Sequence, residues 1–227
     1  MKQKRIVLSL GGSLIVPGGV DVVFLKKFRK LVVDEIKKGK RFVIVCGGGK
    51  LNSEYNEASR KIVKLNNNEL DWLGIHATRF NANFVRILFK DLAYKEITVN
   101  PYQKVRTFKP IIVAAGYEPG WSTDYDTTYL AKAYGSKKLI NLSNIDYVYD
   151  KDPKKFKNAQ PIKKIGWADF RKIVGNKWSP RMNKPFDPIA AKAAQKLGLE
   201  VIILNGNDIG RLKKCLDGKK FKGTIIS

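Results

Sequence analysis

Three glycines and a lysine, Gly47 to Lys50, follow directly on the apolar run FVIVC at residues 42–46. Two other strand-like segments also end in small polar residues, at Gly11-Gly12-Ser13 and in AAGYEPGWSTD at 114–124. Glycine lets main-chain N–H groups approach a ligand closely, and the N-terminus of a helix favours anions. Each loop alone is as typical of a tight turn as of a phosphate site, but three such loops together favour phosphate binding.

The familiar nucleotide-binding motifs do not match these loops. A P-loop requires Ser or Thr after its lysine, and Lys50 is followed by Leu51. A dinucleotide-binding fingerprint requires GxGxxG, which the segment GGGKLN at 47–52 does not complete, and the GxSxG nucleophile elbow is absent. The predicted phosphate site therefore belongs to another class of protein.

The elements that must position these loops alternate between strand and helix. Apolar runs predict strands at 5–10, 41–46, 96–100, 110–116, 137–143, 200–205 and in the closing GTIIS. Helical spacing of apolar residues predicts helices at about 21–39, 51–62, 69–90, 123–134, 167–174, 188–197 and 208–216, with a turn-rich stretch at 144–161. Continuous apolar strands that alternate with helices predict an α/β fold, a mainly parallel sheet with helices on both faces. Ligands of such sheets bind beyond the carboxyl ends of the strands, where the glycines lie.

Composition sets the broad class of the protein. The 227 residues suit one domain, and the apolar fraction of 44% is enough for a core. No stretch approaches the roughly 20 apolar residues of a membrane span, and the two cysteines lack metal-type spacing, so we expect a cytoplasmic protein without a membrane anchor. The 44 Lys and Arg outnumber the 20 Asp and Glu, and the net charge of +24 attracts anionic molecules.

An ordered set of motifs resembles the amino-acid kinase superfamily, and within it the uridylate kinase (UMP kinase) branch in its archaeal-type pattern. The matching segments are SLGGSLI, VCGGGKL, DWLGIHATRFNA, PGWSTD, NIDYVYDKDPKK and FDPIAAKAAQKLGL. The resemblance implies a three-layer α/β/α sandwich, a single domain over 1–227 with a UMP-side lobe at roughly 1–135 and an ATP-side lobe at roughly 136–227. It also implies ATP with Mg²⁺ as phosphoryl donor, UMP as acceptor, UDP as product, and a homo-oligomer that is often a hexamer.

The resemblance further implies a role for each matching residue. Contacts with ATP are implied for Gly11, Gly12, Ser13, Gly49, Ser143, Asn144, Tyr149 and Asp152. Contacts with UMP are implied for Gly48, Asp71 (at the ribose), Tyr117, Glu118, Pro119, Gly120, Trp121, Ser122 and Thr123. Phosphoryl transfer needs alignment and positive charge more than covalent help. We take Lys50, Asp124, Asp146 and Asp187 as the predicted catalytic residues.

Structural alternatives stay open for three of these residues. Asp187-Pro188 has the form of a helix N-cap followed by proline at the first helical position. Asp124 suits the first turn of a helix through the helix dipole, and Asp146 suits a turn.

The chain also departs from the family pattern. Ser9 stands where many members have a lysine, which makes Lys50 and Lys184 the candidate cations for the γ-phosphate of ATP. Tyr125 and Asp126 stand where small residues are usual after the Thr-Asp pair.

Two other functions stay open from the sequence. A sister kinase of the same superfamily would phosphorylate a carboxylate or isopentenyl phosphate, although Cys46 stands where the second type has a histidine. A basic nucleic-acid-binding or regulatory protein on the same fold is motivated by the charge of +24. Nucleic acid is therefore a possible but not a favoured partner.

Overall fold

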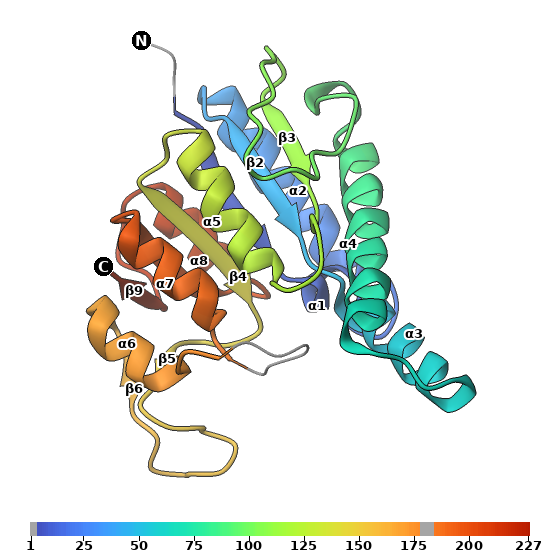
Figure 1. Ribbon diagram of the computed structural model, residues 1–227. Helices are drawn as coiled ribbons and strands as arrows, with labels where there is room; N and C mark the ends of the chain where they lie inside the picture. Colours follow the sequence, from blue (N-terminus) through green and yellow to red (C-terminus); the bar gives the residue numbers. More distant parts are fainter. Residues whose placement is uncertain (1–3, 178–183) are drawn as a thin grey trace.

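The computed structural model describes residues 4–177 and 184–227, and within them a seven-stranded sheet forms the centre of the molecule (Figure 1). The strand order is β3-β2-β1-β4-β8-β9-β7. The strands are β1 Ile6–Leu10, β2 Phe42–Cys46, β3 Ile111–Ala114, β4 Lys138–Ser143, β7 Lys164–Ile165, β8 Glu200–Asn205 and β9 Thr224–Ile226. β3, β2, β1, β4 and β8 pair in parallel and β9 is antiparallel to β8, so the predicted, mainly parallel sheet is confirmed.

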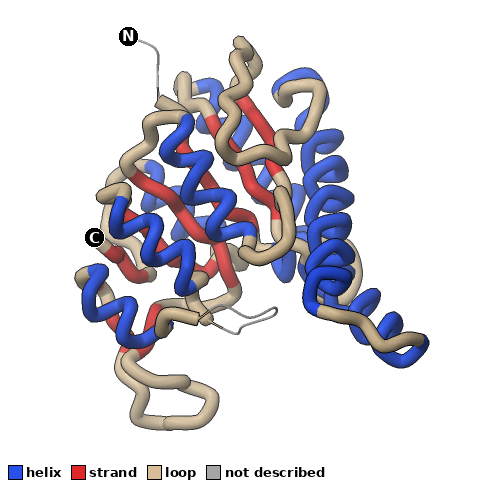
Figure 2. Tube along the Cα trace, in the orientation of Figure 1, coloured by secondary structure: helices blue, strands red, loops and turns tan. Residues whose placement is uncertain are grey.

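Helices cover both faces of this sheet (Figure 2). One face packs against α1 (Gly12–Ile15), α2 (Val22–Lys37), α4 (Asn67–Phe89) and α8 (Ile209–Leu216), and the other against α5 (Thr123–Ala133), α6 (Trp167–Val174) and α7 (Pro188–Lys196). Leu8 and Ile44 belong to the first buried cluster, whereas Val7 and Val43 belong to the second. Because successive side chains of a strand point to opposite faces, the two clusters are the two sides of one sheet. The predicted three-layer α/β/α sandwich is confirmed.

Short polar signals fix where the helices near the carboxyl ends of the strands begin. Asn66 caps α4, because its Oδ1 accepts from Glu69 N at 3.0 Å while the Glu69 carboxylate accepts from Asn66 N at 2.7 Å. α3 (Gly49–Ile62) begins in the glycine run and packs along α4, which ends in a short 3-10 turn at Lys90–Leu92.

No helix among the described residues is long and apolar enough to cross a membrane.

The structure corrects the prediction of a strand at 96–100. Only Thr98 bridges the sheet there, opposite Ala114, and Pro101, which cannot donate to a strand ladder, follows three residues later. The stretch predicted as turn-rich, at 144–161, also contains β5 (Val148–Tyr149), paired with β6 (Pro161–Ile162) at its end. These strands, like β7, have two residues each, too few to give a periodic signal. The division into two lobes stays a prediction.

Candidate active site

The loops that follow β1 and β2 pack backbone against backbone. A Cβ atom on Gly12 would lie 2.0 Å from Gly49 N and 2.6 Å from the carbonyl carbon of Gly47. A Cβ atom on Gly49 would lie 2.3 Å from Gly12 O, and Gly49 has a φ of +63°, which glycine adopts without strain. The fold itself therefore requires glycine at these positions, apart from any contact with a ligand.

Gly48 is the member of the glycine run that faces a cavity. It is the N-cap residue of α3, whose first N–H groups have no partner within the helix. Buried Asn81 on α4 fixes the loop, because its Nδ2 donates to Gly47 O at 2.8 Å and to Gly48 O at 3.0 Å. Asn81 lies in the motif DWLGIHATRFNA, but no role was predicted for it, since a lone amide inside a helix has no distinctive pattern of its own.

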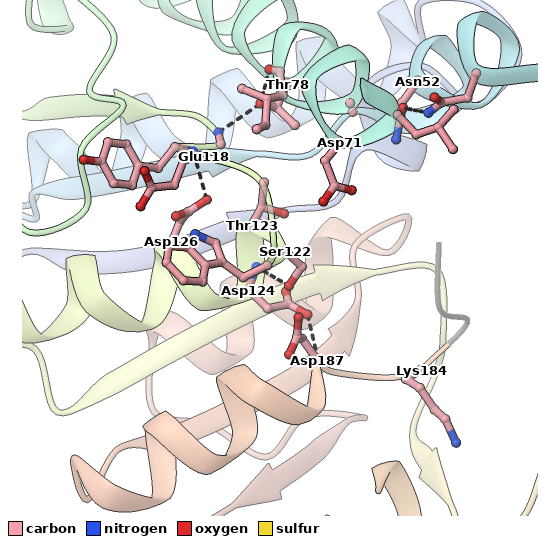
Figure 3. A pocket seen from close by; sticks show the side chains of 18 of the residues that line it. Asn52, Asp71, Thr78, Glu118, Ser122, Thr123, Asp124, Asp126, Lys184 and Asp187 are labelled. Carbon is pink, nitrogen blue, oxygen red and sulfur yellow. Dashed lines mark hydrogen bonds between the residues drawn. The ribbon is translucent and has the colours of Figure 1, made fainter. Parts of the chain in front are cut away.

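The first cavity, of about 220 Å³, lies between α3, α4, the loop at 116–122 and the start of α5 (Figure 3). Predicted residues that line it are Gly48, Asp71, Tyr117, Glu118, Trp121, Ser122, Thr123, Asp124 and Asp187. Pro119 and Gly120 belong to the same loop but do not line the cavity. Polar residues of the lining that were not assigned to the site from the sequence are Asn52, Asn56, Arg60, Thr78 and Asp126. Asn52, Asn56 and Arg60 recur every four residues along α3, which is a helical signal that sequence reasoning missed.

Side chains of α4 hold the 116–122 loop in place over the cavity. Thr78 Oγ1 accepts from Gly116 N at 2.9 Å, and the guanidinium of Arg79 donates to Tyr117 O at 2.8 Å. Asp71 Oδ2 accepts from Gly120 N at 3.0 Å. Burial raises the pKa of Asp71, and the bond from Gly120 opposes that rise. The loop wall of the cavity is therefore tied to one helix at several points.

Two carboxyl groups meet in the first cavity where α5 approaches α7. Asp124 Oδ2 accepts from Asp187 N at 3.1 Å. Asp187 Oδ1 accepts from Ile189 N at 2.5 Å and from Ala190 N at 2.9 Å, so its predicted N-cap geometry is confirmed. Burial, together with the charge of Asp187, raises the pKa of Asp124 to about 7. Catalytic roles for the two acids stay predictions.

A second cavity, of about 610 Å³, lies beyond the carboxyl end of β4. Four residues that were predicted to hold ATP line it, namely Ser143, Asn144, Tyr149 and Asp152. Lys184 lines both cavities, and its Nζ donates to Ile173 O at 3.4 Å. The structure thus brings the two predicted groups of ligand contacts to neighbouring hollows that share one lysine.

Other predicted residues lie outside both cavities. Gly11, Gly12, Ser13 and Gly49 belong to the packed loops, and the side chain of Lys50 is exposed on the first turn of α3. Asp146 accepts from Asn205 at 2.9 Å and from Arg211 at 2.7 Å, and these bonds lower its pKa. Its carboxylate therefore ties the loop after β4 to α8, and a catalytic role for Asp146 stays a prediction without support from the geometry.

Part of the positive charge collects far from these cavities. A third hollow at the amino ends of β1, β4 and β8 is lined by Lys4, Lys137, Lys163, Lys219 and Lys220. Because parallel strands carry their ligand sites at the carboxyl ends, this hollow is separate from the candidate active site.

The comparisons with known proteins agree with this fold. A sequence model of the amino acid kinase family matches residues 4–205. A uridylate kinase from Pyrococcus abyssi is 33% identical, with 98% of this chain and 99% of that protein covered. One from Thermoplasma volcanium is 34% identical, with 99% and 98% covered. The crystal structure of uridylate kinase from Archaeoglobus fulgidus superposes with a TM-score of 0.83 at 27% identity, over 98% of this chain and 100% of that chain.

The contact between the glycine loops predicts the effect of one added methyl group. Gly12→Ala should lower the free energy of unfolding by about 1–3 kcal/mol, because its Cβ would meet backbone atoms that cannot move aside independently. Gly18→Ala is the matched control, since a Cβ there has no atom within 4 Å. Urea unfolding of both variants measures the difference. Equal stability of the two variants would show that the loops do not pack as described.

Proposed function

The chain belongs to the amino acid kinase family, and from that premise we propose that it transfers the terminal phosphoryl group of ATP to UMP, giving UDP and ADP. The observation that carries the proposal is the pair of neighbouring cavities, one lined by Gly48, Asp71 and Thr123 and one by the residues predicted to hold ATP. Similarity to uridylate kinases over the whole chain favours this activity over a sister kinase or a nucleic-acid-binding protein.

The first cavity suits a nucleoside monophosphate through two helix N-termini. Gly48 is the N-cap of α3 and Ser122 is the N-cap of α5, and both line the cavity. The dipoles of both helices favour a phosphate at this point. Lys50 N already donates to Val16 O and Asp124 N to Ser122 Oγ, so the other N–H groups of the first turns would donate to the phosphate. Asp71 lies on the same cavity wall, where its carboxylate would accept hydrogen bonds from the ribose hydroxyls of UMP.

The second cavity would hold ATP, with its terminal phosphate directed toward the first. In-line transfer requires the two phosphates to approach, and their repulsion must be offset by positive charge. Lys184 lines both cavities, whereas Ser9 supplies no charge and Lys50 lines neither. We therefore assign the offsetting charge to Lys184 in preference to Lys50.

Mg²⁺ would supply further charge neutralisation at the phosphates. The described residues include no group of three His, Cys, Asp or Glu side chains that could hold a metal ion. Mg²⁺ commonly binds through substrate phosphates and water with few protein ligands, so entry of the ion with ATP fits the residues present.

Three further properties are proposed on the family resemblance alone. We propose a cytoplasmic enzyme, a homo-oligomer that is a hexamer, and a place in pyrimidine nucleotide synthesis through the UDP that it makes.

The activity is tested by an acceptor panel. Formation of ADP is followed in a coupled assay with UMP, CMP, dUMP, acetylglutamate and isopentenyl phosphate. We expect UMP to give the highest kcat/KM, because the first cavity carries groups for a phosphate and a ribose. Turnover with acetylglutamate or isopentenyl phosphate but not with UMP would overturn the proposal.

The Asp71 carboxylate predicts a preference for ribose. Hydrogen bonds to a charged group are worth about 1.5–3 kcal/mol, so UMP should exceed dUMP in kcat/KM by about tenfold or more. Asp71→Ala should reduce this ratio toward unity with little change in the KM for ATP. Asp91→Ala, at an exposed acid, is the control. An unchanged ratio in Asp71→Ala would remove Asp71 from the ribose site.

The shared lysine predicts a ranking of two alanine variants. Lys184→Ala should lower kcat by about a hundredfold, the scale seen when one charge-stabilising donor is removed from a transition state. Lys50→Ala should lower it much less, because its side chain is exposed and lines neither cavity. Steady-state kinetics of both variants, with exposed Lys61→Ala as control, measure the ranking. A larger loss of kcat in Lys50→Ala than in Lys184→Ala would assign to Lys50 the charge that offsets the repulsion of the phosphates.

A further inference from the structure

Asp126, on the second turn of α5, carries a buried carboxyl group that the mechanism above does not use. Only 1% of the residue is exposed, yet it lines the first cavity. Its Oδ2 accepts from Tyr117 N at 3.3 Å, whereas its Oδ1 is buried and has no hydrogen-bond partner in the described part of the chain. Buried polar atoms in proteins are nearly always paired, so an unpaired one in a cavity wall points to a group that a ligand supplies.

Trp121 presents a second unpaired atom on the same wall. Its Nε1–H is buried and finds no acceptor among residues 4–177 and 184–227. The indole ring stacks on Tyr125 at 4.6 Å between centroids, with 23° between the planes, which holds its orientation. An indole N–H is only a donor, so the missing partner of Trp121 is an acceptor.

The protonation state of Asp126 decides what its carboxyl group can offer. Burial raises the pKa of Asp126 well above its ordinary value, and the charges of Glu118 and Asp124 act in the same direction. The hydrogen bond from Tyr117 N and the charge of Arg79 oppose the rise without cancelling it. Burial therefore favours the neutral form of Asp126. In that form, with Oδ2 accepting from Tyr117 N, the free Oδ1 can carry the hydrogen and donate it.

The shape of the cavity places Asp126 and Trp121 at the end where the base of a bound nucleotide would lie. Gly48 marks the phosphate end, and a Cβ on it would touch Asn52. In Figure 3, Asn52 and Asp126 lie at opposite sides of the cavity, with Asp71 and Thr123 between them. A nucleotide with its phosphate at Gly48 and its ribose at Asp71 therefore directs its base toward Asp126 and Trp121.

We propose that Asp126 and Trp121 read the base of the acceptor nucleotide by donating hydrogen bonds to a carbonyl at C4 of a pyrimidine. This inference rests on the proposed function and names the residues that select within it. Uracil carries a carbonyl oxygen at C4, which accepts hydrogen bonds. Cytosine carries an amino group there, and this donor would face the donors of Asp126 and Trp121 without an acceptor between them. Asp126 stands where the family pattern has a small residue, so the use of a carboxyl group for this selection is particular to this chain.

The test compares the affinities of UMP and CMP by isothermal titration calorimetry. Wild-type protein should bind UMP more tightly than CMP by about tenfold or more, the scale of one hydrogen bond lost with a buried partner left unpaired. Asp126→Ala should bring the ratio of the two dissociation constants close to unity. Asp126→Asn should keep the preference for UMP, because its amide can accept from Tyr117 N and donate at the position of Oδ1. Exposed Asp169→Asn is the control and should leave the ratio unchanged.

Two results would overturn the proposal. One is an unchanged ratio in Asp126→Ala, and the other is a loss of preference in Asp126→Asn equal to that in Asp126→Ala. If Asp126→Ala does not fold, Trp121→Phe carries the test, because it keeps the ring and removes only the donor. Trp121→Phe should lower the affinity for UMP more than the affinity for CMP, and an equal loss of affinity for both would contradict the proposal. Failure of the wild-type protein to bind UMP at all would instead contradict the proposed function.

Discussion

No side chain fits between the loops that follow β1 and β2, because backbone atoms of Gly12 already lie where a Cβ of Gly49 would stand. This contact brings the N-terminus of α3 to the carboxyl end of the parallel sheet. Asn81 then holds the carbonyl groups of Gly47 and Gly48, which leaves Gly48 as part of the cavity wall. The phosphate site, the ribose site and the approach to the second cavity are all positioned from this point.

The first cavity combines a predicted phosphate site with several carboxyl groups. Each of these acids accepts a hydrogen bond from a main-chain N–H group: Asp71 from Gly120, Asp124 from Asp187, and Asp126 from Tyr117. Burial raises the pKa of all three, and that of Asp124 reaches about 7. Partial protonation of Asp124 near neutral pH reduces the negative charge that would repel a phosphate. The cavity wall can therefore carry several acids without excluding the phosphate of a nucleotide.

The sequence predicted the longer strands and helices and about half of the residues that line the first cavity, because these depend on apolar periodicity, caps and an ordered set of motifs. It failed at 96–100, where one bridge at Thr98 replaces a strand, and at the two-residue strands, which are too short to show a period. Lys50 follows the glycines directly, but the left-handed turn at Gly49 and the start of α3 leave its side chain exposed. Asn81 acts through contacts with Gly47 and Gly48, which are distant from it in sequence. Asp126 accepts from Tyr117, nine residues earlier, across the turn that leads into α5, and no periodic pattern reports such a contact.

The most direct measurement of the central claim is a crystal structure of the protein with UMP and a non-hydrolysable ATP analogue. We expect the phosphate of UMP at Gly48 and the N-terminus of α5, and the triphosphate in the second cavity with its last phosphate directed toward Lys184. The uracil ring should lie at Asp126. A UMP bound with its phosphate at Asp126, or a triphosphate bound away from Ser143 and Tyr149, would contradict the account.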